Sequence, residues 1–116
     1  MPKKKVLIVE DKANYSFVWC KKLKDQFEIV LAESIKEAEH IFKKDSSFDL
    51  IVMDCCVPGD VPNTMDLVKM IRKTYHGPIL ANSSLDDYID ILIMAGADHR
   101  SDKHSVPGKV ITILGL

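Results

Sequence analysis

The chain of 116 residues is long enough for one domain with a buried core and too short for two. Hydrophobic residues make up 47% of it and charged residues 28%, and the net charge of -1 excludes a nucleic-acid binder that relies on a broad basic surface. No apolar stretch is long enough to cross a bilayer, and the N-terminus is no signal peptide. We therefore expect a cytoplasmic protein with no membrane partner and no direct nucleic-acid partner.

The cysteines Cys20, Cys55 and Cys56 are odd in number and have no C-x-x-C spacing. Neither a disulfide framework nor a structural zinc site is therefore indicated. Cys55 and Cys56 follow a carboxylate directly and could be reactive, but we expect them to be small buried hydrophobic residues.

The first half of the chain predicts a strand, a helix, a strand and a helix. The first strand, over residues 4–9, ends in acidic residues, and a helix follows to about Lys24. Trp19 is expected on a separate, partly exposed stripe of that helix. A short strand at 28–32 and a helix capped by Ser34 come next. The residues expected to face the sheet near the first helix are Ala13, Phe17, Cys20 and Phe27.

The second half continues this alternation from an apolar strand at 49–54, which ends in Asp54. Strands and helices then alternate to the end of the chain, which predicts a doubly wound parallel α/β sheet covered on both faces. We expect a single domain over residues 1–116. The elements expected after residue 54 are a loop at 55–63, a helix at about 63–75, a strand at 78–82, a helix at 85–94, a short polar strand at 99–101 and a helix at 106–114.

Polar residues of particular kinds follow the predicted strands. The carboxyl ends of parallel strands meet at one edge of such a sheet, so these side chains should converge. Packed carboxylates repel one another and need a divalent cation or a proton, and an all-oxygen ligand set favours Mg²⁺. A hydroxyl and an ammonium beside the metal would complete a site for a phosphoryl group. The residues concerned are Glu10, Asp11, Asp54, Ser83 and Lys103.

The order of these residues resembles the receiver domain of two-component response regulators, and the resemblance covers essentially the whole chain. The acidic pair after the first strand looks like the family's acidic pair, and Asp54 looks like its phospho-accepting aspartate, with Pro58 four residues further on. Residues 78–83 are similar to the strand that leads to the family's switch Ser/Thr, and residues 96–103 to the segment that ends in its lysine. The resemblance implies the flavodoxin-like (βα)5 fold with strand order 2-1-3-4-5.

The resemblance also implies a phosphoryl acceptor and a metal site. Asp54 would take a phosphoryl group from the phosphohistidine of a sensor histidine kinase or a histidine phosphotransfer protein. Asp11, Asp54 and the backbone carbonyl of Cys56 would hold Mg²⁺, with Glu10 contacting the ion through water.

Two further residues have roles implied by the family. Lys103 would pair with a phosphoryl oxygen, and Ser83 would move to hydrogen-bond another, which couples phosphorylation to the helix that follows it. The chain would then be a signalling switch in a two-component system. It would promote its own phosphotransfer and dephosphorylation without being an enzyme in the usual sense.

Three departures from the family pattern stand out. Arg100 occupies a position that is usually Tyr or Phe, so the aromatic rotamer switch is in doubt, and Arg100 could pair with a nearby acid or bind a partner. His104 follows Lys103, where the family has a proline in a cis bond. A cis bond before a non-proline residue costs about 2.5–4 kcal/mol. We therefore predict a trans Lys103–His104 bond with a reshaped loop, or a rare strained cis bond. The loop after Pro58 lacks the usual Asp-Gly pair and is about two residues longer, so Gly59 and its neighbours should set a different lip to the pocket.

Other interpretations stay open at this point. A pseudo-receiver would keep the fold but act as a phosphorylation-independent interaction module. An aspartyl phosphohydrolase would need a second carboxylate two residues after the nucleophile, where this chain has Cys56. The last two helices are apolar on more than one side, which predicts either scattered apolar surface or a partner or homodimer surface made by the fourth helix, fifth strand and fifth helix. The chain is either a stand-alone receiver or a piece of a longer protein.

Overall fold

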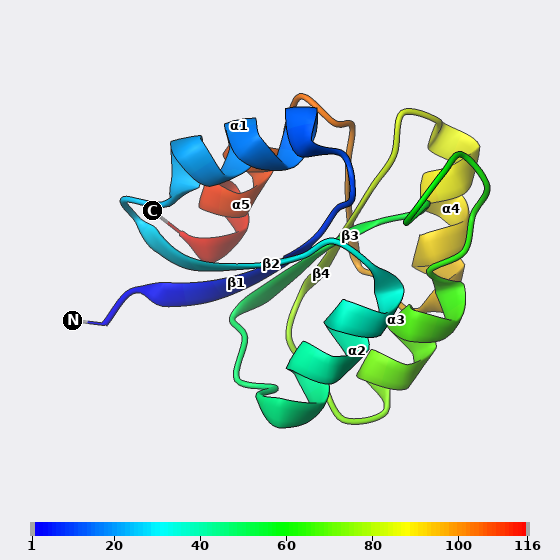
Figure 1. Ribbon diagram of the computed structural model, residues 1–116, viewed down its shortest axis with the longest axis horizontal. Coiled ribbons are helices and arrows are strands. Elements are labelled where there is room, and N and C mark those ends of the chain that lie inside the picture. Colours follow the sequence, from blue (N-terminus) through cyan, green and yellow to red (C-terminus); the bar gives the residue numbers. More distant parts are fainter. Residues whose placement is uncertain (1, 116) are drawn as a thin grey trace.

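The computed structural model describes residues 2–115, and strands and helices alternate strictly along that part of the chain (Figure 1). The sheet is parallel with strand order β2-β1-β3-β4-β5, so the predicted doubly wound, flavodoxin-like fold is confirmed. None of the described helices is long and apolar enough to cross a membrane. The elements are β1 (Lys4–Val9), α1 (Ala13–Leu23), β2 (Phe27–Ala32), α2 (Ile35–Lys44), β3 (Leu50–Asp54), α3 (Met65–Arg72), β4 (Ile79–Asn82), α4 (Asp86–Ala95), β5 (His99–Ser101) and α5 (Val106–Leu114).

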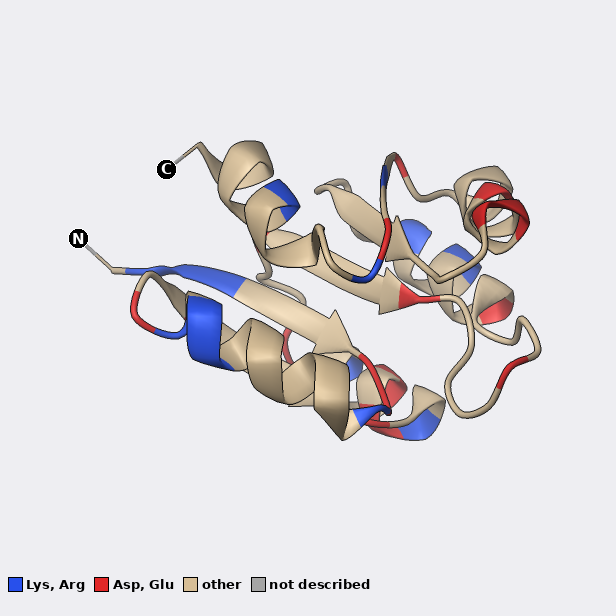
Figure 2. Cartoon of the chain, turned by 90° about the horizontal axis from the view of Figure 1, so that it is seen from above, with Lys and Arg blue, Asp and Glu red and all other residues tan. Residues whose placement is uncertain are grey.

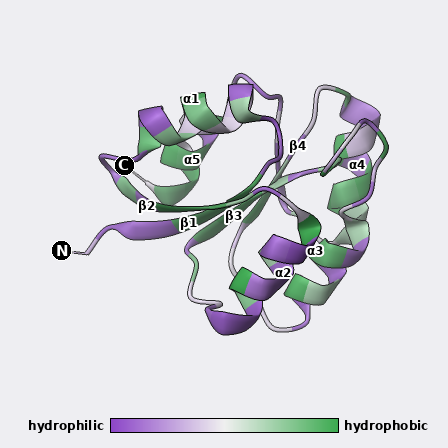
Figure 3. Ribbon diagram, in the orientation of Figure 1, coloured by the Kyte–Doolittle hydropathy of each residue, from purple (hydrophilic) through white to green (hydrophobic). Residues whose placement is uncertain are grey.

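Helices cover both faces of the sheet: α1 and α5 lie on one side, and α2, α3 and α4 on the other (Figure 1). Successive residues of a strand point to opposite faces, so Val6 and Ile8 of β1 pack against α1 and α5, whereas Leu7 and Val9 pack against the other layer. Every residue of β3 is buried. β3 and the second half of β1 are therefore apolar without alternation, and they appear green in Figure 3, whereas the two lysines that begin β1 are purple.

The helix boundaries differ from the prediction chiefly at α3. The predicted Ser34 cap of α2 is present, because Ser34 Oγ accepts a hydrogen bond from the Glu37 N–H at 3.0 Å. α3 was expected over about 63–75 but begins at Met65 and ends at Arg72. It begins late because the two preceding polar residues bond to the loop and to the end of β3 instead of continuing a helix.

The sheet-facing side of α1 was predicted wrongly. Phe17 is 69% exposed and Ala13 is also exposed, whereas Trp19, which was expected to be partly exposed, is only 2% exposed. Cys20 is half-buried, and Phe27 is buried but belongs to β2. The buried stripe of the helix consists of Ser16, Trp19 and Leu23.

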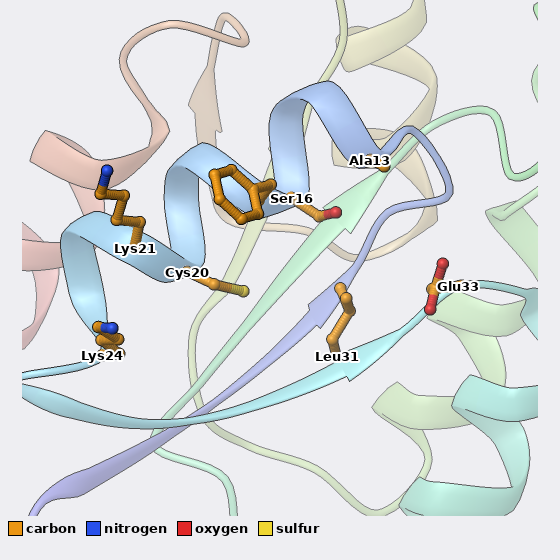
Figure 4. Close-up of a pocket in the computed structure, with 8 residues that line it drawn as sticks. Ala13, Ser16, Cys20, Lys21, Lys24, Leu31 and Glu33 are labelled. Atoms are coloured by element: carbon orange, nitrogen blue, oxygen red, sulfur yellow. The ribbon is translucent and has the colours of Figure 1, made fainter.

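A groove of about 510 Å³ lies between α1 and the edge strand β2 (Figure 4). Cys20 and Leu31 face one another across it, and Lys21 and Lys24 lie toward the end of the helix. The groove is lined by apolar and basic side chains together with Glu33, and it does not include the carboxylates that the sequence analysis singled out.

Candidate functional site

The strand register brings the predicted site residues to one edge of the sheet. Asp54, the last residue of β3, pairs with Asn82 of β4, which in turn pairs with Ser101 of β5. Glu10 directly follows β1, the other neighbour of β3. Figure 2 shows acidic segments where β1 and the neighbouring strand end. The predicted convergence of polar residues at the carboxyl ends of the strands is therefore present in the structure.

Three carboxylates meet at this edge. One oxygen each of Glu10, Asp11 and Asp54 lies within 4.8 Å of the others. Glu10 is 0% exposed and Asp54 is 3% exposed. Within residues 2–115, the buried Oδ1 atom of Asp11 has no hydrogen-bond partner. A buried carboxylate oxygen without a donor, beside further carboxylates, fits a hard divalent cation such as Mg²⁺.

Lys103 supplies positive charge to the same site. Its Nζ atom lies 2.6 Å from Glu10 Oε1 and 3.0 Å from Asp54 Oδ1. The side chain is largely buried, so these ion pairs are little screened by solvent. The lysine comes from the loop after β5 and crosses to the ends of β3 and β1, where it partly neutralises two acids.

Glu10 binds its proton more tightly than an ordinary glutamate does. Burial, together with the nearby charge of Asp54, raises the pKa of Glu10 from 4.5 to about 7, although the Lys103 ammonium opposes the shift. Near neutral pH, Glu10 therefore exchanges a proton easily unless a cation is bound. This behaviour is expected of carboxylates that share one pocket.

Ser83 lies beside the acidic cluster but faces a different partner. It follows Asn82 at the end of β4 and is 5% exposed. Its Oγ accepts a hydrogen bond from the Leu85 N–H at 3.2 Å. In this state the hydroxyl is engaged with the start of α4, the helix to which its predicted movement would be coupled.

Two polar residues that the sequence analysis did not assign hold the loop after Asp54. Thr64 Oγ1 donates to the carbonyl oxygens of Asp54 and Cys55, at 2.8 and 3.1 Å. The Asn63 side chain accepts from the Val57 N–H at 2.8 Å and donates to the carbonyls of residues 57 and 58. Asn and Thr before a helix are frequent loop-closing residues, so their types were the signal available in the sequence.

The lip of the site is formed by the tip of this loop. Gly59 adopts φ +90°, and Val61 is 72% exposed. Lys12 Nζ reaches Asp60 Oδ1 at 3.4 Å from the opposite side of the site. Cys56, whose carbonyl was predicted as a metal ligand, is buried at the base of the loop, and that ligand role stays a prediction.

Asn82 was missed as a residue of this region. It is 0% exposed, and neither its Nδ2 nor its Oδ1 atom has a hydrogen-bond partner in the described part of the chain. It pairs with Asp54 in the sheet, so an unsatisfied buried amide adjoins the candidate acceptor. A polar residue at the end of an apolar strand was the signal in the sequence.

Two of the departures from the family pattern, Arg100 and His104, lie in β5 and in the loop after it. The Lys103–His104 bond is trans, as predicted, since the Val57–Pro58 bond is the one cis bond among residues 2–115. Arg100 does pair with a nearby acid: its Nη2 lies 2.5 Å from Asp90 Oδ1. His104 lines a hollow of about 260 Å³ together with Lys103 and Trp19.

Comparisons with known proteins agree with this geometry. The response regulator receiver domain family matches residues 6–114. A search of curated proteins found no match. A two-component response regulator from Clostridium difficile is similar in structure, with a TM-score of 0.82, 23% identity and coverage of 97% of this chain and 96% of that one.

Two further solved structures share the fold. The chemotaxis protein CheY4 of Vibrio cholerae has a TM-score of 0.79 and 22% identity, over 96% of this chain and 98% of that one. A Burkholderia pseudomallei response regulator, solved with a phosphorylated aspartic acid, calcium and citrate, has a TM-score of 0.82 and 16% identity, over 97% of this chain and 66% of that one. Receiver domains generally bind Mg²⁺ at an acidic site and take their phosphoryl group from histidine kinases or phosphotransfer proteins. The family match spans nearly the whole sequence, so this chain belongs to the response regulator receiver domains.

Proposed function

We propose that this chain is a phosphorylation-dependent signalling switch that accepts a phosphoryl group on Asp54. The observation that carries the proposal is the placement of Asp54 between Lys103 Nζ, at 3.0 Å, and the carboxylates of Glu10 and Asp11. The donor would be the phosphohistidine of a sensor histidine kinase or a histidine phosphotransfer protein. The similar Burkholderia structure, which holds a phosphorylated aspartic acid, adds support by likeness of fold.

The transfer itself forms one bond and breaks one. A carboxylate oxygen of Asp54 attacks phosphorus in line, the P–N bond breaks, and the imidazole departs with the bonding electron pair and takes up a proton. Asp54 then carries an acyl phosphate. Lys103 would pair with a phosphoryl oxygen, and Ser83 would turn from Leu85 to donate a hydrogen bond to another.

The residues around Asp54 also suit the expected metal. Asp11, Asp54 and the Cys56 carbonyl would hold Mg²⁺, with Glu10 reaching it through water, and the ion would offset negative charge on the phosphoryl oxygens. The unpartnered Oδ1 of Asp11 supports this assignment. Burying an unsatisfied charged group for structure alone is costly, which favours this role over that of a pseudo-receiver.

Other features of the prediction remain proposals. The surface made by α4, β5 and α5 stays the proposed homodimer surface, and Met94 on α4 is 88% exposed. The cytoplasmic address, the single-domain assignment of residues 1–116 and dephosphorylation by the chain itself are likewise proposed.

The function is tested by incubating the protein with acetyl phosphate and Mg²⁺ and reading the intact mass. We expect one phosphoryl adduct on the wild type, none on Asp54→Asn, and none after prior addition of a chelator. Asp90→Asn is the matched control, because Asp90 is an exposed acid outside the site and should leave the adduct unchanged.

The pseudo-receiver predicts the opposite pattern. No adduct on the wild type, either with the small donor or with a phosphorylated histidine phosphotransfer domain, would contradict the proposal. An adduct on Asp54→Asn would show that another residue is the acceptor. Mg²⁺ binding by calorimetry, compared between wild type and Asp54→Asn, tests the metal site separately.

A further inference from the structure

The main chain of Lys103 is held by α1. The indole Nε1–H of Trp19 donates to the Lys103 carbonyl oxygen at 3.1 Å, across 84 positions of sequence. Trp19 is 2% exposed and Lys103 is 7% exposed, so water has little access to compete for this bond. In Figure 1 the orange loop that precedes α5 passes beside the blue helix α1. Helix α1 thus contacts the main chain of the lysine.

The same helix also lines the end of that side chain. Lys103 Nζ lies 5.2 Å from the ring centroid of Tyr15 and 5.5 Å from that of Trp19. The two rings stack with centroids 5.9 Å apart and planes at 28°. They are four residues apart and so share one side of the helix. The ammonium is enclosed by two carboxylates and two aromatic rings, and the ring faces attract its positive charge.

The turn around Lys103 is held locally, because the Ser105 N–H donates to Asp102 Oδ1 at 2.8 Å, but this bond does not reach the lysine itself. A proline after Lys103 would restrict the backbone, but residue 104 is histidine, and the bond between them is trans. The lysine side chain is flexible, yet its amine lies within contact distance of both Glu10 and Asp54. The buried bond from Trp19 is a contact from elsewhere in the fold that holds Lys103 directly.

We infer that Trp19 is a positioning residue for Lys103: its N–H holds the lysine carbonyl and its ring, with that of Tyr15, holds the ammonium at the phosphoryl site. The inference rests on the proposed function, since Lys103 acts there on the phosphoryl group. Trp19 touches no reacting atom and acts only through Lys103. A displacement of about 1 Å in a positioned group can lower a rate by about a hundredfold. Lys103 is not a candidate metal ligand, so metal binding should change much less than phosphoryl transfer.

The test compares the wild-type chain with Trp19→Phe, which keeps a ring and removes the N–H donor. With acetyl phosphate as donor, we expect the phosphorylation rate to fall by about tenfold or more. The Mg²⁺ dissociation constant, measured by calorimetry, should stay within about twofold. Trp19→Tyr, which also lacks the indole donor, is a second variant should Trp19→Phe fail to fold, and the same loss is expected.

Leu23→Val is the matched control. Leu23 lies on the same buried stripe of α1 and is 0% exposed. The described contacts of Lys103 are made by residues other than Leu23. This variant weakens the packing of the helix without touching the bond to the lysine, so its phosphorylation rate should match the wild type. If Leu23→Val slows transfer as much as Trp19→Phe, the effect is one of helix stability and the inference is wrong. A rate for Trp19→Phe within about twofold of wild type would also overturn it.

A second readout separates this inference from the proposed function. In wild type without metal, ring currents should displace the NMR resonances of the Lys103 ε-methylene, and Trp19→Phe should move them toward those of an exposed lysine. If the wild type takes no phosphoryl group, the proposed function fails, and this displacement still reports whether Trp19 places Lys103. Unchanged Lys103 resonances in Trp19→Phe would rule out the positioning role.

Discussion

Two ion pairs of nearly equal length differ sharply in how deeply their side chains are buried. Lys103 meets Glu10 at 2.6 Å with both side chains buried, whereas Arg100 meets Asp90 at 2.5 Å with side chains that are 51% and 60% exposed. Exposed pairs contribute about 0–1 kcal/mol, while removing one partner of a buried pair costs about 3–5 kcal/mol. Distance alone therefore says little about what each pair does.

The comparison separates the acidic cluster from β5. Around Asp54, the charged residues Glu10 and Lys103 follow the family pattern and are fixed by burial. At β5, the family's aromatic position is an arginine, whose ion pair with Asp90 is exposed. A buried and an exposed basic side chain thus lie a few residues apart, on β5 and on the loop after it.

The largest effect is expected from Lys103→Met, which keeps much of the side-chain stem and removes the charge. Glu10 and Asp54 then face one another without a counter-charge, so the free energy of unfolding near pH 8, without metal, should fall by about 3–5 kcal/mol. Urea denaturation measures it, and added Mg²⁺ should restore part of the loss. Lys109→Ala, an exposed lysine of α5, is the control and should change stability by less than about 0.5 kcal/mol. Equal losses in the two variants would show that the buried ion pairs of Lys103 contribute no more to stability than an exposed lysine does.

An intermediate effect is expected in the pH dependence of stability. The pKa of Glu10 is raised from 4.5 in the unfolded chain to about 7 in the fold, so the folded state binds this proton more tightly. The resulting stability is complete below pH 4.5 and is lost as pH rises through 7. From about pH 5 to 8 without metal, this loss should be about 2 kcal/mol in wild type and absent in Glu10→Gln.

Asp90→Asn is the matched variant for that experiment. It removes an exposed carboxylate, so its pH profile should follow the wild type across the same range. Parallel profiles for wild type and Glu10→Gln would mean that Glu10 stays ionised in the pocket.

The smallest effect is expected from Arg100→Ala. Loss of the exposed pair with Asp90 should change the free energy of unfolding by less than about 0.5 kcal/mol, and added salt should shrink that change further. Thermal melts at low and high ionic strength would measure both. A loss comparable with that of Lys103→Met would show that Arg100 holds β5 in place.

The order of elements and the meeting of the acids were predictable from sequence, for a physical reason. Apolar runs such as β3 must be covered on both faces, and parallel strands bring their carboxyl ends together whatever the details of packing. Glu10, Asp54 and Lys103 were therefore placed correctly without any knowledge of side-chain contacts.

The sheet-facing side of α1 was not predictable in the same way. Aromatic and apolar residues occur around much of that helix, so periodicity alone did not choose between Phe17 and Trp19. Trp19 packs against residues of the sheet and of α5 and donates a hydrogen bond to a carbonyl 84 residues away, and these contacts exist only once the sheet is assembled. The bonds from Asn63 and Thr64 to the loop and strand end were missed for the same reason.

The bonds of Asn63 and Thr64 have a consequence for how this domain can vary. Both residues fasten the base of the loop, to the main chain of residues 54–58, so the tip beyond that base is not needed to hold Asp54. Gly59, Asp60 and Val61 form an exposed tip, tied to the rest of the site through the surface pair of Asp60 with Lys12. Substitutions or insertions at the tip should therefore leave the position of Asp54 unchanged. The rim of the pocket can thus change in sequence without changing the positions of the carboxylates beside it.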